Sequence, residues 1–68
     1  MENKPKWVLK HNKNDSYYKL VLNETGEYLW KTSTKELKEA TTFDNYLQAC
    51  NYAKFNPAFT LVSYKNEL

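Results

Sequence analysis

The chain has 68 residues and a single cysteine, Cys50, so a disulfide within the chain is excluded. A chain of this length buries only a little over half of its unfolded surface, which leaves one small core and no room for a second domain or a deep catalytic pocket. Ten lysines and eight acidic residues give a net charge of +2 without a block of one sign, and arginine is absent. An acidic nucleic-acid mimic is therefore excluded, and a DNA reader that contacts guanine through arginine is disfavoured.

The first half of the chain predicts three strands that form an antiparallel meander. Apolar and polar residues alternate over Trp7–His11, and the Asn, Asp and Ser residues of 12–16 predict a turn before a second strand at Tyr17–Leu22. The third strand is expected at 27–32, because Gly26 is the only glycine and stands where a hairpin turn needs a positive φ. This hairpin is expected at the centre of the sheet.

The second half predicts one main helix and a last strand. Residues 33–36 have the S-x-x-E form of a capping box, but few apolar residues follow, so only a short helical turn is expected there. Asn45 predicts the start of the main helix, with its side chain accepting a hydrogen bond from the amide of Gln48. The helix is expected to end near Asn56, and 59–64 predict the fourth strand. Apolar residues with helical spacing form one stripe on this helix: Tyr46, Ala49, Cys50 and Ala53.

The predicted fold is an α+β domain in the order β-β-β-α-β, an antiparallel four-stranded sheet with one main helix on one face. We expect residues 1–68 to form this single domain, with residues 1–5 frayed. No apolar run approaches the roughly 20 residues of a membrane span, and we expect no signal peptide, because the first residues have neither its apolar stretch nor a small-residue cleavage site. The expected location is therefore the cytoplasm, without membrane contact.

No catalytic, metal or phosphate-binding motif stands out, so we expect no enzymatic activity and no cofactor. His11 lacks a partner placed by the sequence for general-base chemistry and is interpreted as an exposed histidine at a strand end. Cys50 as a nucleophile is disfavoured because it lies within the helix stripe, away from the helix start that would lower its pKa. One histidine and one cysteine are too few for a tetrahedral zinc site. Trp7 and Trp30 are expected to anchor the core rather than to stack on a ligand.

A candidate contact surface follows from counting layers, because one helix covers one face of the sheet and the other face must meet water or a partner. Alternation along the strands assigns these residues to the helix side: Trp7, Leu9, Tyr18, Leu20, Leu22, Tyr28 and Trp30. The residues assigned to the open, partner-binding face are Val8, Lys10, Tyr17, Lys19, Val21, Leu29 and Lys31. Apolar and aromatic residues inside a polar rim are typical of protein interfaces, whereas lysine stems that cover the apolar atoms would leave the face unpartnered.

Residues 39–54 carry a resemblance to a known group of proteins. Their sequence, EATTFDNYLQACNYAK, follows a meander and precedes a final strand, and in this it resembles small accessory proteins encoded by phages and prophages of low-GC Gram-positive bacteria. The resemblance covers roughly residues 7–64 and departs at Cys50 and Asn51, where charged residues would be expected. It implies a non-enzymatic module that binds and inhibits a host or defence protein by steric occlusion in the host cytoplasm. The abundant lysine and asparagine, whose codons are A-rich, fit an AT-rich genome.

A second resemblance concerns the joint between strand and helix. Phe43 and Ala49 form an F-x-x-x-x-x-A pattern after three strands, which resembles AP2-like DNA-binding domains, including the arm-binding domains of phage integrases. It implies an alternative function, a nucleic-acid-binding domain that uses the lysines of the same sheet face. Those domains use arginine-rich strands, which this chain lacks, and a fourth strand is outside their pattern. Protein binding is therefore the first hypothesis, with a host or defence protein or a second copy of the chain as partner.

Overall fold

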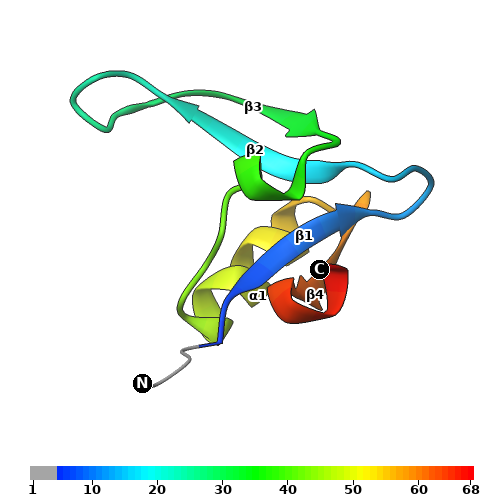
Figure 1. Ribbon diagram of the computed structural model, residues 1–68. Coiled ribbons are helices and arrows are strands. Elements are labelled where there is room, and N and C mark those ends of the chain that lie inside the picture. The colour runs from blue at the N-terminus through cyan, green and yellow to red at the C-terminus, as the bar shows by residue number, and fades with distance from the viewer. Residues whose placement is uncertain (1–4) are drawn as a thin grey trace.

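The computed structural model describes residues 5–68 and has the order of elements expected from the sequence (Figure 1). The α+β class, with a four-stranded antiparallel sheet and one α-helix, is confirmed. Residues 1–4, which were expected to fray, lie outside the described part of the chain. The elements are strands β1 (Trp7–His11), β2 (Tyr17–Leu22), β3 (Tyr28–Thr34) and β4 (Phe59–Ser63), helix α1 (Tyr46–Phe55), and the 3₁₀ helices η1 (Leu37–Glu39) and η2 (Tyr64–Glu67).

The sheet has the strand order β3-β2-β1-β4, and all neighbouring strands are antiparallel. After α1, the chain returns beside β1, where β4 pairs over the whole strand from Trp7↔Ser63 to His11↔Phe59. The central strands are therefore β1 and β2. The expectation that the β2–β3 hairpin lies at the centre is wrong, because β4 adds to the free edge of β1 and leaves β3 at the edge of the sheet.

The turn between β2 and β3 forms as the sequence predicts. Gly26 has a φ of 87°, a left-handed conformation that costs a residue without a Cβ very little. The side chain of Asn23 fixes the rest of the turn, since its Oδ1 accepts from the backbone N–H groups of Thr25 at 3.0 Å and Glu27 at 2.8 Å. The hairpin therefore has a well-defined tip.

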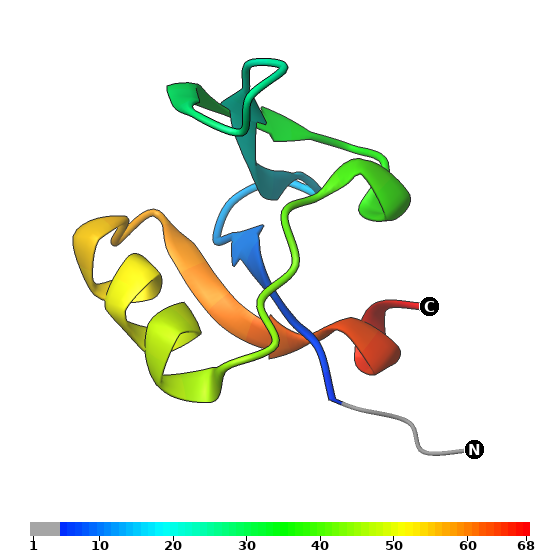
Figure 2. The same cartoon turned by 90° about the vertical axis from the view of Figure 1, so that its left-hand side faces the viewer.

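Helix α1 begins and ends where the sequence indicates. Asn45 is its N-cap, with Oδ1 accepting from the Gln48 amide at 3.0 Å, and Asn56 is its C-cap. Ala49 is fully buried, so the helix lies close to the sheet. Figure 2 shows α1 alongside β1 and β4, with the β2–β3 hairpin beyond the part of the sheet that the helix covers.

The sheet carries buried side chains on both of its faces. On the helix side the buried cluster consists of Leu9, Tyr18, Phe43 and Ala49. On the opposite side it consists of Val8, Tyr17 and Ala40, with Leu37, Val62 and Tyr64 packed against it. The two 3₁₀ helices thus contribute side chains to the face opposite α1, which the sequence predicted to be open.

Candidate binding surface

The predicted open face is not a free surface at its centre. Val8 has no exposed area and Tyr17 is 8% exposed, so their assignment to an open face is wrong. They are covered by Leu37 from η1 and Tyr64 from η2, together with the buried Ala40. The sequence predicted only one helix, α1, as a cover for the sheet, because a single turn of 3₁₀ helix leaves almost no periodic signal in a sequence.

Two of the predicted lysines hold the 3₁₀ helices on this face. Lys10 Nζ lies 3.0 Å from Glu67 Oε1, which also accepts a hydrogen bond of 2.8 Å from the phenol of Tyr17. Hydrogen bonds from Lys10 and then Tyr17 lower the pKa of Glu67 below its ordinary value. Lys19 Nζ lies 3.2 Å from Glu39 Oε1 at the end of η1. Both lysines are therefore engaged within the chain.

A β-bulge in β3 reverses the alternation on which the face assignment depended. Val21 pairs with Trp30, but the next residue of β2, Leu22, pairs with Tyr28. Leu29 is therefore the extra residue of the bulge. Val21 is half-buried and shares its face with Trp30, while Leu22 and Tyr28 share the opposite, helix-side face.

Because of the bulge, two residues lie on the faces of the sheet opposite to those predicted. Trp30 was expected toward α1 but lies on the opposite face, and it is 55% exposed rather than a core anchor. Lys31 was expected on that opposite face, but it pairs with Leu20 and lies on the helix side. There Lys31 Nζ donates to Asn56 Oδ1 at 3.0 Å. Leu29 is exposed, as predicted.

Exposed apolar side chains gather on the β2–β3 hairpin and at the two ends of α1. On the helix side, α1 packs on β1 and β4 and leaves Leu22 and Tyr28 in the outer part of the hairpin uncovered, while Trp30 is exposed on the opposite face. The hairpin residues and their exposed fractions are Leu22 52%, Tyr28 58%, Leu29 47% and Trp30 55%, and those of α1 are Tyr46 52%, Leu47 72% and Phe55 80%. Large apolar residues that are exposed together mark interaction sites.

A groove of about 620 Å³ lies between the hairpin and the C-terminal end of α1, and we call it the hairpin–helix groove. It is lined by Tyr18, Leu20, Leu22, Gly26, Tyr28, Lys31, Tyr52, Phe55 and Asn56. Apart from Lys31, none of these residues was in the predicted site. The sequence held one signal for it, since Phe55 is apolar yet falls outside the helix stripe.

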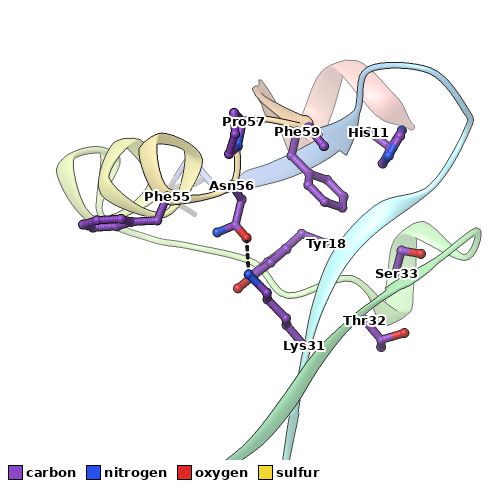
Figure 3. Close-up of a pocket in the computed structure, with 10 residues that line it drawn as sticks. His11, Tyr18, Lys31, Thr32, Ser33, Phe55, Asn56, Pro57 and Phe59 are labelled. Atoms are coloured by element: carbon purple, nitrogen blue, oxygen red, sulfur yellow. Dashed lines mark hydrogen bonds between the residues drawn. The ribbon is translucent and has the colours of Figure 1, made fainter.

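A second hollow of about 490 Å³ adjoins this groove (Figure 3). It shares Tyr18, Lys31, Phe55 and Asn56 with the groove, and its other lining residues are His11, Thr32, Ser33, Pro57, Ala58 and Phe59. The hydrogen bond from Lys31 to Asn56 connects the hairpin to the end of the helix at this point (Figure 3). Asn56 is held in turn by its Nδ2, which donates to Tyr52 O at 2.7 Å.

The charge of the groove comes from one residue. No carboxylate is among the residues that line either hollow, and Lys31 is the lysine in both sets. Burial raises the pKa of Tyr18 above its ordinary value, while its hydrogen bond with Asn56 lowers it, so the phenol is neutral at pH 7. The hairpin–helix groove is therefore largely apolar and aromatic, with one cationic group on its wall.

His11 and Cys50, the two residues considered for chemistry, each contact other residues of the fold. His11 is half-buried rather than exposed, its Nδ1 accepts from the Lys13 N–H at 3.1 Å, and its ring meets Phe59 edge-on at 5.1 Å. Cys50 is half-buried on α1, and a hydrogen bond with Cys50 raises the pKa of Tyr46. Across residues 5–68, no group of three or more His, Cys, Asp or Glu residues is placed to hold a metal ion.

Comparison with known proteins gives no relative from which a function could be transferred. No protein-family model, no curated protein and no solved structure matches this chain. Among the helices of residues 5–68, none has the length and apolar character needed to cross a membrane.

Proposed function

We propose that this chain is a non-enzymatic protein-binding module, of phage or prophage origin, that blocks a host or defence protein by covering part of its surface. The observation that carries the proposal is the exposed apolar surface of the β2–β3 hairpin. Tyr28 and Trp30 are each more than half exposed on an edge strand, on opposite faces of the hairpin. Tryptophan and tyrosine are the residues most enriched at the energetic centres of protein interfaces.

The shape of the molecule supports a steric mechanism. The hairpin is fixed by the Asn23 side chain and the glycine turn, and it lies beyond the part of the sheet that α1 covers (Figure 1, Figure 2). A rigid, preformed apolar surface loses little conformational entropy on binding. Such a module can occlude a partner's surface one-to-one without chemistry of its own.

The nucleic-acid alternative has less support from the placement of the lysines. Lys10 and Lys19 are paired with Glu67 and Glu39, and Lys31 lies on the other face of the sheet. A nucleic-acid surface needs cations that follow the phosphate backbone together. Complexes driven by lysine lose affinity steeply as salt rises, so only strong binding of nucleic acid would persist at about 150 mM salt. Such binding to purified DNA or RNA would reverse this preference.

The test is capture of partners from a lysate of a low-GC Gram-positive host, followed by mass spectrometry. Leu22→Asp and Tyr28→Asp should abolish capture of a stoichiometric protein partner while far-UV circular dichroism shows the fold retained. Leu47→Asp is the matched control, because Leu47 is 72% exposed on α1 and is not a lining residue of either hollow. Capture of the same proteins by the hairpin variants, or loss of capture with Leu47→Asp alone, would contradict the proposed surface.

A further inference from the structure

We infer that the hairpin–helix groove receives an amphipathic helix of the partner protein, with an apolar stripe on the sheet and an acidic side chain at Lys31. The inference rests on the proposed function, since it specifies how the exposed hairpin is used. It follows from the width of the uncovered face, the groups that the groove presents and the charge of its wall.

The uncovered part of the sheet has the width of one helix. An α-helix with its side chains is about 10–12 Å wide, and neighbouring strands are about 4.8 Å apart, so one helix covers about two strands. Helix α1 covers β1 and β4. On the same face, Tyr18 of β2 is buried against Tyr52 of α1, and the uncovered part is the outer part of the β2–β3 hairpin, where Leu22 and Tyr28 are exposed across the width of two strands.

The face of the sheet favours a helix over an extended segment. Its backbone groups point toward neighbouring strands, so the groove presents mainly side chains, and an extended segment lying there would leave its own N–H and C=O groups unpaired. A helix satisfies these groups internally. Addition of a strand to the edge of β3 is disfavoured by the bulge at Leu29, because bulges interrupt the regular pairing that an edge offers.

The lining residues specify the chemistry of the bound helix. Leu22, Tyr28 and Phe55 are exposed apolar residues on two walls of the groove, and they fit an apolar stripe with the i, i+3, i+4, i+7 spacing. Lys31 donates one hydrogen bond to Asn56, but an ammonium group has three donors. A glutamate or aspartate beside the stripe can therefore form a charge-assisted hydrogen bond with Lys31.

The positive charge of Lys31 favours a different protein over a second copy of this chain as the occupant of the groove. Helix α1, with sequence YLQACNYAKF, contains no acidic residue and carries Lys54 in its last turn. If the α1 helix of a second copy lay in the groove, it would bring a like charge toward Lys31 and no carboxylate. The occupant we infer is therefore a helix of another protein.

The test uses a displayed library of peptides of about 18 residues, or five helical turns. Leucine is fixed at positions of the i, i+3, i+4, i+7 pattern, and the other positions vary among Glu, Lys, Gln and Ala. Selection on the wild-type protein should enrich helical peptides with glutamate beside the stripe. Tyr28→Asp and Leu22→Asp should each weaken these peptides by at least about tenfold. Leu47→Asp, on α1 outside the lining of both hollows, should leave their affinity within about twofold.

Reversal of the wall charge is the decisive variant. Lys31→Glu should switch the enriched peptides from glutamate to lysine beside the stripe, a change that a purely apolar contact would not produce. The inference is overturned if no helical peptide is enriched, if the peptides bind Tyr28→Asp and Leu22→Asp as well as the wild type, or if Lys31→Glu leaves their composition unchanged. Loss of host-protein capture in the hairpin variants without helical enrichment would refute the helix and keep the protein-binding function. Helical enrichment without any captured protein would refute that function instead.

Discussion

Replacement of Tyr17 by aspartate tests the corrected layer arrangement most directly. Tyr17 is 8% exposed, and its phenol donates to Glu67. Loss of a buried aromatic ring costs about 3–5 kcal/mol, and a buried carboxylate beside Glu67 adds a further penalty. At roughly 0.05–0.15 kcal/mol per residue, a chain of this size has only about 3–10 kcal/mol of stability. Tyr17→Asp should therefore be largely unfolded.

The matched variant is Trp30→Asp, which lies on the same face of the sheet but on the edge strand. Trp30 is already 55% exposed, so less than half of a ring's burial is lost, about 1–2 kcal/mol, and the new carboxylate remains in water. Urea unfolding followed by far-UV circular dichroism measures both variants, and Tyr17→Phe isolates the phenol at about 1 kcal/mol. A folded Tyr17→Asp together with an unfolded Trp30→Asp would show that the 3₁₀ helices do not cover this face.

Three further measurements test other parts of the fold. Hydrogen exchange should be slowest in the central strands β1 and β2 and faster in β3, and protection concentrated in β3 would contradict the strand order. Gly26→Ala should lower the free energy of unfolding by about 1 kcal/mol, because its φ of 87° strains a residue with a Cβ while no neighbouring atom lies within 4 Å of the added group. The pKa of Glu67 is lowered from 4.5, so its stabilisation is complete at pH 7 and is lost as the pH falls through and below that value. Glu67→Gln should flatten the fall in Tm between about pH 5 and pH 3 relative to the wild type, leaving the part due to Glu27, whose pKa is also lowered.

The parts of the fold that the sequence predicts are those decided by local chemistry. Asn45 caps α1 because an asparagine oxygen is the acceptor that a free helix amide needs, and Gly26 sets the turn because it alone adopts a positive φ at low cost. The burial of Ala49 could be predicted because the apolar residues of the helix recur with helical spacing. None of these inferences requires knowledge of which strands are neighbours.

The contact face could not be predicted, because it depends on pairing between distant residues. The extra residue Leu29 changes the alternation of β3, and an alternating pattern without a partner strand does not reveal a bulge. The burial of Val8 depends on η1 and η2, which are too short to leave a periodic signal. The error in the predicted face of Lys31 has the largest consequence, since the position of this lysine decides the charge of the groove.

The coverage of the sheet connects the fold to the inferred partner. A four-stranded sheet needs about two helices to cover one face, and this chain supplies one. On the opposite face, two single-turn helices and the contacts of Glu67 cover β1 and the start of β2, so the chain protects the centre of its sheet and not the hairpin. Tyr28 and Phe55 consequently remain exposed on the walls of one groove. A helix supplied by another protein would complete the layer, and the stability of the complex would then come from the same apolar burial that the isolated chain lacks.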